Sequence, residues 1–116
     1  MVFAAFEGTL RRMDALMIVA RLAPGAHADA ERLVLKGPPF DPEELGFHRH
    51  RVYLTATEVV FLFEAPEVEW IVDDLVNDPI ASAAFAAWRS LLDGPPRLAH
   101  QKYVWTRTSA ETREAR

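Results

Sequence analysis

The 116-residue chain has 50% hydrophobic and 26% charged residues, a formal net charge of −4 at pH 7 and no cysteine. The composition is that of a globular protein, and the length corresponds to one domain, residues 1–116, that can bury a core without covalent cross-links. The excess of acidic residues argues against a nucleic-acid partner. The lack of cysteine excludes disulfides, thiolate metal ligands and cysteine nucleophiles. It is also compatible with a cytoplasmic location.

The two ends of the chain are not expected to belong to the core. Residues 1–12 place a basic pair after their apolar residues, the reverse of the order in a signal peptide, so export is not expected. We interpret them as an N-terminal extension, with an extra edge strand or a misassigned start as the alternatives. Residues 109–116 are polar and are expected to form a frayed tail. Because the longest apolar runs are far shorter than the roughly 20 residues of a membrane span, no membrane contact is expected.

The first elements are a strand and a helix. Residues 14–22, DALMIVARL, form a nearly continuous apolar run that ends at a turn beginning with Pro24. Such a run predicts a strand that is covered on both faces. Residues 26–36 carry apolar residues at helical spacing, acidic residues early and a lysine last, which predicts a helix that ends at Gly37.

The middle of the chain predicts a β-hairpin. Residues 41–45 begin with a capping aspartate and a proline, and predict one helical turn. Residues 46–65 then contain two strand-length runs rich in β-branched and aromatic residues, which predict two antiparallel strands joined by a two-residue turn at Ala56 and Thr57. A slip of one residue in either strand would exchange its faces. The expected cross-strand pairs are Leu54 with Val59, Val52 with Phe61, His50 with Phe63, Arg51 with Leu62 and Arg49 with Glu64.

Two helices and a strand are expected after the hairpin. Residues 66–77 show an apolar stripe opposite acidic residues, which predicts an amphipathic helix. Asp78 and the proline after it predict the start of a further helix that extends to Leu92. Residues 100–107 alternate around apolar and aromatic side chains and predict a short final strand.

This order of elements is the βαββαβ pattern of a ferredoxin-like α+β fold, a four-stranded antiparallel sheet with helices on one face. We expect the other face to display Met17, Val19, Val52, Phe61 and Phe63 together. Leaving four such side chains in water forgoes roughly 6 to 12 kcal/mol, at about 1.5 to 3 kcal/mol each, and apolar patches of this size mark interfaces. A face-to-face homodimer is therefore expected.

The sequence also resembles a known group of proteins. Four features resemble those of the dimeric α+β barrel superfamily. They are the run IVARLAPG at residues 18–25, the helix after it, Gly46 with a basic cluster, and a hairpin that ends in Phe63, Glu64 and Ala65. Within it the VAR-x-APG opening is most similar to aromatic polyketide cyclases of the tetracenomycin type, and the resemblance extends to antibiotic-biosynthesis monooxygenases and stress-responsive barrel proteins. It covers residues 14–107 and implies a homodimer whose sheets enclose a cavity in each subunit. The pocket histidine of the cyclase pattern falls near Phe61, which is apolar here.

His50 is the candidate catalytic residue, because an imidazole with a pKa near 6.5 can transfer a proton at neutral pH. The alternative is a hydrogen-bonded interface histidine. His48 lies on the same face, but two imidazoles without a third ligand do not make a metal site, so no metal is expected. Arg49 and Arg51 could bind a carboxylate or enolate of a ligand, or could serve only to discourage edge pairing.

Three functional hypotheses follow. The first is a homodimeric enzyme that cyclises or oxygenates a small aromatic or polycyclic molecule without a cofactor, using His50 and the polar residues His48, Arg49 and Arg51. The second is a ligand-binding or stress-associated barrel without catalysis, and the third is a structural dimer with a filled barrel. No phosphate-binding loop, nucleophile elbow or paired-carboxylate site is present. Phe85 and Trp88 are expected in the core, whereas the substrate-binding walls are expected to be Val52, Phe61, Phe63, Tyr103 and Trp105.

Overall fold

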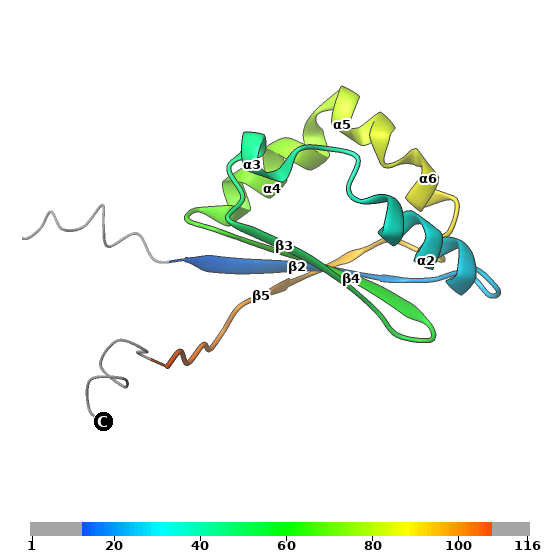
Figure 1. The fold of residues 1–116 in the computed structure, drawn as a ribbon, viewed down its shortest axis with the longest axis horizontal. Coiled ribbons are helices and arrows are strands. Elements are labelled where there is room, and N and C mark those ends of the chain that lie inside the picture. Colours follow the sequence, from blue (N-terminus) through cyan, green and yellow to red (C-terminus); the bar gives the residue numbers. More distant parts are fainter. Residues whose placement is uncertain (1–12, 108–116) are drawn as a thin grey trace, which may run out of the picture.

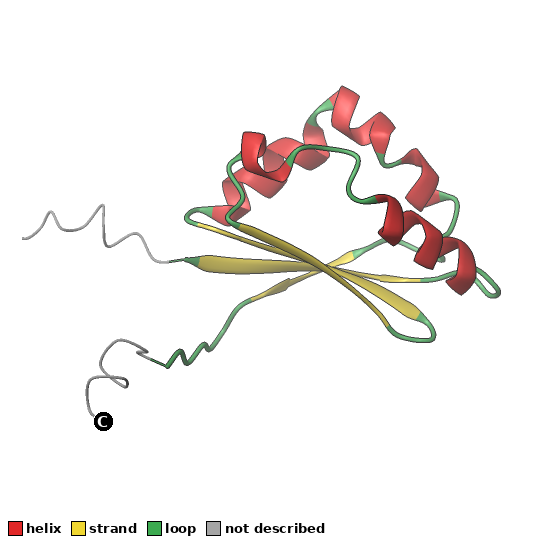
Figure 2. Cartoon of the chain, viewed as in Figure 1, coloured by secondary structure: helices red, strands yellow, loops and turns green. Residues whose placement is uncertain are grey.

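The computed structural model describes residues 13–107, which form one antiparallel sheet with the helices on one of its faces (Figures 1 and 2). The strand order is β3-β4-β2-β5. This confirms the predicted ferredoxin-like α+β architecture, whereas the extension and the tail predicted at residues 1–12 and 109–116 lie outside the described residues. The elements in chain order are β2 (Asp14–Arg21), α2 (His27–Lys36), α3 (Pro42–Leu45), β3 (Arg49–Leu54), β4 (Glu58–Ala65), α4 (Val68–Asn77), α5 (Pro79–Ala84), α6 (Ala86–Arg89) and β5 (Arg97–His100).

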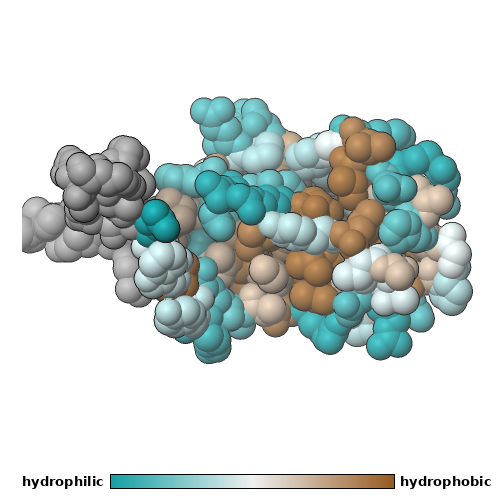
Figure 3. All heavy atoms as spheres, turned by 60° about the horizontal axis from the view of Figure 1, so that its bottom comes forward, coloured by the Kyte–Doolittle hydropathy of each residue, from teal (hydrophilic) through white to brown (hydrophobic). Residues whose placement is uncertain are grey.

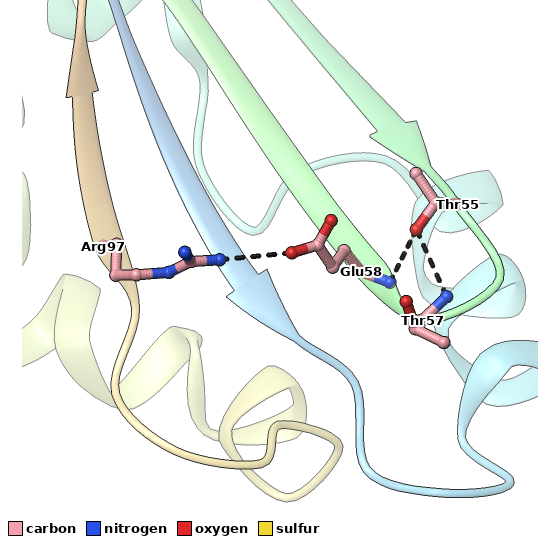
Figure 4. A network of polar contacts seen from close by, with 4 residues as sticks. All are labelled: Thr55, Thr57, Glu58 and Arg97. Atoms are coloured by element: carbon pink, nitrogen blue, oxygen red, sulfur yellow. Dashed lines mark hydrogen bonds and ion pairs between the residues drawn. The ribbon is translucent and has the colours of Figure 1, made fainter.

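The β3–β4 hairpin has the predicted register. Every expected cross-strand pair is present, including His50 opposite Phe63. The hydroxyl oxygen of Thr55 accepts hydrogen bonds from the backbone amides of Thr57, at 3.2 Å, and Glu58, at 2.8 Å, and so fixes the two-residue turn (Figure 4). Because side chains alternate along a strand, this turn also determines which residues of β3 and β4 share a face.

Two hydrophobic clusters lie between the sheet and the helices. Partly buried Phe61 and Phe85 pack against both clusters, and therefore lie where the two meet. The cluster beneath α4 contains Leu16, Phe47, Phe63, Ala65, Val68, Val72 and Leu75. The cluster beneath α2 and α6 contains Ala20, Leu22, Ala26, Ala30, Val59 and Trp88.

The uncovered face of the sheet differs from the prediction. Met17 and Val19 lie on it as expected, but Val52, Phe61 and Phe63 point toward the helices. The prediction was wrong because it placed odd-numbered residues of β2 and odd-numbered residues of β4 on one face. In the structure, even-numbered residues of β2 pair with odd-numbered residues of β4, and directly paired residues share a face. The register between distant strands, which decides this, is not visible in either strand alone.

The last third of the chain departs from its predicted bounds in two places. The helix expected up to Leu92 is interrupted at Phe85, where the backbone φ and ψ are −89° and 5°, and the Arg89 guanidinium donates a hydrogen bond of 2.8 Å to the Ser82 carbonyl across the interruption. The final strand is residues 97–100 instead of 100–107, because its pairing with β2 ends there. The chain after it is exposed.

The short helix α3 offers a test of local stability. The Asp41 carboxylate accepts hydrogen bonds from the amides of Glu43, at 3.1 Å, and Glu44, at 3.4 Å. We expect Asp41→Ala to lower the free energy of unfolding by about 1 kcal/mol, because these amides lose their acceptor. Urea denaturation measures the change, and Asp41→Ser should restore most of it. An alanine variant as stable as the wild type would contradict the capping role.

Candidate functional site

Two adjacent cavities lie where the two hydrophobic clusters meet. The first, which we call the His50 cavity, has a volume of about 190 Å³. The second, the Arg89 cavity, has a volume of about 220 Å³. Four side chains border both cavities: Phe61, Phe63, Phe85 and Trp88. The His50 cavity is completed by Leu33, Val34, Gly37, Pro38, Pro39, Phe40, His50 and Val52, and the Arg89 cavity by Ile18, Ala20, Leu75, Val76, Ser82, Arg89, Leu92 and Pro96.

The wall between the cavities is aromatic. The rings of Phe61 and Trp88 meet edge to face, with their centroids 5.1 Å apart and their planes at 88°. Phe61 comes from β4 and Trp88 from α6, so the sheet and the helices each supply one ring. Phe85 reaches the cavities because it lies at the interruption between α5 and α6. Such walls suit a flat apolar ligand, since aromatic rings attract one another in stacked and edge-to-face arrangements.

His50 is the titratable group of the first cavity. Its ring stacks on Phe63, with centroids 4.6 Å apart and planes at 20°, and lies 5.6 Å from the ring of Phe40. Nδ1 is 3.0 Å from the carbonyl oxygen of Leu62. Because a carbonyl oxygen only accepts hydrogen bonds, Nδ1 carries the proton and donates it, and the lone pair of neutral His50 is on Nε2.

The surroundings of His50 favour its neutral form. Burial of the half-buried ring lowers the pKa of His50 below its ordinary value of 6.5, although the hydrogen bond to Leu62 acts in the opposite direction. Among residues 13–107, no side chain makes a hydrogen bond with Nε2. The arrangement therefore presents an unprotonated imidazole nitrogen beside an aromatic cavity at neutral pH, which is what a general base requires.

The structure brings four of the predicted site residues together. His50, Val52, Phe61 and Phe63 alternate on the helix-covered face of the hairpin and line the same cavity. His48 precedes β3 and is exposed, with its amide donating to the Glu64 carbonyl at 2.8 Å. It borders an open surface hollow beside His50 instead of the cavity itself.

The other predicted site residues lie elsewhere. Arg49 and Arg51 point to the uncovered face of the sheet, where Arg49 pairs with Glu64 at 3.7 Å and Arg51 donates to the Tyr53 hydroxyl at 3.1 Å. Neither arginine lines the His50 cavity, but Arg49 borders the open surface hollow together with His48 and His50. Tyr103 and Trp105, exposed by 82% and 70%, follow β5 and line neither cavity.

Sequence reasoning missed part of the cavity lining. Phe40 was assigned no role, yet its ring faces those of Phe47, His50, Phe63 and Phe85 at centroid distances of 5.6 to 6.4 Å. The pattern that could have pointed to it is an aromatic residue directly after Gly37, Pro38 and Pro39, a rigid linker that crosses over the sheet between α2 and α3 (Figure 1). Phe85 and Trp88 were expected only in the core, and they also form the wall that the cavities share.

Two further observations concern metals and membranes. Within the part of the chain that the structure describes, no three His, Asp or Glu side chains are grouped closely enough to hold a metal ion. None of the helices between residues 13 and 107 has the length and apolar character that crossing a bilayer requires.

No protein-family model and no curated protein sequence matches the chain. Several solved structures are similar. A proposed antibiotic biosynthesis monooxygenase from Bordetella bronchiseptica has a TM-score of 0.67 and 17% identity, covering 80% of this chain and 98% of that one. Tetracenomycin F2 cyclase from Streptomyces glaucescens, a type-II polyketide cyclase, has a TM-score of 0.63 and 16% identity, covering 80% and 97%. A protein of unknown function from Nitrosomonas europaea has a TM-score of 0.62 and 19% identity, covering 82% and 92%. The resemblance expected from the sequence is thereby confirmed as a shared fold.

Proposed function

We propose that this protein binds a flat, enolisable aromatic molecule in the cavities between its helices and its sheet, and that His50 removes a proton from it. The observation that carries the proposal is the state of His50: Nδ1–H is bound to the Leu62 carbonyl and burial keeps the pKa low, so Nε2 is free to accept a proton. Two cavities of about 190 and 220 Å³ argue against a filled barrel with a purely structural role.

Two reactions begin with this proton transfer. In an oxygenation, the carbanion formed from an activated CH₂ group adds to O₂, and the resulting peroxide loses water to leave a carbonyl. One oxygen atom enters the product, the other leaves as water, and the four electrons come from the substrate carbon. In a cyclisation, the enolate carbon attacks a carbonyl of the same molecule and water is lost, with no oxidant. A proposed monooxygenase and a polyketide cyclase are both among the structures that share the fold.

The proposal is tested by incubating the full chain with anthrones, naphthols and linear poly-β-ketones, with and without O₂. We expect at least one compound to be converted, with a mass change that fits either the exchange of two hydrogens for an oxygen or the loss of water. Binding without conversion in the whole panel would leave a ligand-binding protein and contradict the enzymatic part. A ligand at 100 times its Kd should stabilise the fold by about 2.7 kcal/mol, so thermal shifts identify binders first.

We also propose that the protein is a homodimer formed through the uncovered face of the sheet. Figure 3, in which this face comes forward, shows hydrophobic residues across its middle between hydrophilic ones. Met17 and Val19 of β2 lie beside Val60 and Leu62 of β4 there. Ion pairs flank them, such as Arg97 with Glu58 at 3.1 Å (Figure 4).

The occupant best suited to this face is a second copy of the chain. The exposed segment after β5, with Tyr103 and Trp105, extends beyond the sheet in Figure 1, and a two-fold pairing lets each copy cover the apolar face and the aromatic segment of the other.

We expect Val19→Glu to convert the dimer to a monomer, because a carboxylate would be buried without a partner at the centre of the interface. Light scattering at micromolar concentration measures the mass. Leu35→Glu, on α2 and exposed by 83%, is the matched control and should leave the mass unchanged. A wild-type chain that is monomeric under these conditions would contradict the dimer.

A further inference from the structure

The Arg89 cavity is bordered by an exposed charged side chain, Arg89, that the proposed function does not yet use. Arg89 is the one charged residue among the described side chains that line this cavity, and the rest of the lining is apolar apart from Ser82. His50 borders only the neighbouring cavity. His50 therefore lines one cavity, Arg89 lines the other, and four aromatic side chains border both.

The guanidinium is positioned and still has unused hydrogen-bonding capacity. One of its nitrogens, Nη1, donates to the carbonyl oxygen of Ser82 at 2.8 Å, which ties the side chain to α5. No carboxylate within residues 13–107 forms an ion pair with Arg89. By contrast, Arg32, Arg49 and Arg97 each have an acidic partner. A guanidinium has five N–H donors, so most of those of Arg89 remain available for a planar anion.

The volumes indicate the length of the ligand. A cavity of about 150 Å³ holds one benzene ring, so each of the two cavities, at about 190 and 220 Å³, has room for about one ring. Either cavity alone is smaller than the roughly 300–1,000 Å³ of ordinary small-molecule sites, whereas the two joined fall within this range. A ligand that occupies both must displace the shared side chains, of which Phe61 and Trp88 meet at their edges.

We propose that Arg89 binds an anionic group, a carboxylate or an equivalent oxyanion, at the end of an elongated ligand whose other end reaches His50. The ligand class is thus an aromatic acid of at least two rings, with its acidic group in the Arg89 cavity and its reacting carbon in the His50 cavity. The inference rests on the proposed function only in placing a ligand in these two cavities, and it requires no turnover.

The test compares two probes that differ only in charge, 2-naphthoate and 2-naphthamide, binding to the full chain by calorimetry and NMR. We expect the wild type to bind the carboxylate about five- to tenfold more tightly than the amide, the lower range for a charge-assisted hydrogen bond at a partly exposed site. Arg89→Gln should remove this preference. Because the neutral amide makes no charge-assisted hydrogen bond with Arg89, its Kd for the variant should stay within about twofold of its Kd for the wild type. Arg32→Gln, which removes an exposed charge on α2, should keep the preference.

The outcomes separate this inference from the proposed function. Three outcomes would overturn the role of Arg89 and leave the proposed function untouched. The wild type could bind both probes equally well, Arg89→Gln could keep the preference for the carboxylate, or Arg32→Gln could lose that preference as fully as Arg89→Gln does. Binding of neither probe would overturn the two-cavity site, and the proposed function with it. If Arg89→Gln does not fold, contacts between naphthoate ring protons and the Arg89 side chain in the wild-type NOE spectrum decide the question, and their absence overturns the inference.

Discussion

Replacing His50 with glutamine is expected to reduce the turnover of a substrate found for this protein by roughly 100- to 10,000-fold, the usual contribution of a general base. Glutamine keeps a planar polar group of similar size and can donate to the Leu62 carbonyl, as Nδ1 does at 3.0 Å in the wild type. It has no lone pair that accepts a proton near neutral pH. The variant should therefore bind ligands and fold as the wild type does, and lose only the chemical step.

The measurement is kcat and KM for the wild type, His50→Gln and His27→Gln. His27 begins α2 and lines neither cavity, so its replacement controls for the loss of an imidazole. We expect kcat to fall only in the His50 variant. A His50→Gln variant with kcat within threefold of the wild type would overturn the assignment of His50 as the base.

The pH dependence follows from the same residue. Because burial lowers the pKa of His50 below 6.5, the active neutral form persists below pH 6.5, and the rate should decline only on the acid side of that value. Stability changes in the same direction: between the lowered pKa and pH 6.5 the unfolded state binds more protons, so the free energy of unfolding rises with pH and falls on acidification. An NMR titration of the imidazole checks the pKa directly, and a midpoint above 6.5 would contradict the proposed state.

Replacing Phe63 with alanine is expected to lower the free energy of unfolding by about 3–5 kcal/mol, a large share of the stability of a typical domain. The side chain is 2% exposed, and its ring contacts those of Phe47 and His50 at centroid distances of 4.8 and 4.6 Å. Its removal takes away apolar burial and leaves a void beneath the helices. The stacking partner of His50 disappears as well.

Urea denaturation measures the loss, with Leu35→Ala as the matched control. Leu35 is 83% exposed on α2, so its truncation should change the free energy of unfolding by no more than about 0.5 kcal/mol. If Phe63→Ala does not fold, Phe63→Leu should fold with a smaller loss. A Phe63→Ala variant within 1 kcal/mol of the wild type, roughly the ordinary effect of a point mutation, would show that the core does not depend on this ring.

The hairpin could be predicted because its determinants are local. Its alternation and its two-residue turn lie within one stretch of chain, and together they place His50 opposite Phe63 and on the face of Val52. The cap of α3 by Asp41 is local in the same way. The sequence therefore predicts correctly that His50, Val52, Phe61 and Phe63 share a face of the hairpin, but not that this face is the one covered by the helices.

What could not be predicted depends on pairings between distant segments. The register of β2 with β4 decides that Phe61 points to the helices, and neither strand encodes this alone. The position of β5 depends on its pairing with β2, so the aromatic alternation around Tyr103 suggested a strand in the wrong place. Phe40 was missed because a loop residue has no periodicity, and its role comes from where the linker crosses the sheet.

The position of β2 at the centre of the sheet has a consequence for the order of folding. The β3–β4 hairpin closes through a two-residue turn, and hairpins form in roughly 1–10 μs. β2 pairs more slowly, because each of its pairings closes a long loop at a cost in chain entropy. It pairs Asp14 with Ala65 on one side and Val19 with Arg97 on the other. We therefore expect an intermediate in which β2 has joined the hairpin but β5 has not. In that intermediate the edge of β2 that pairs with β5 in the native sheet is open, so β2 becomes the segment most prone to pair with another chain.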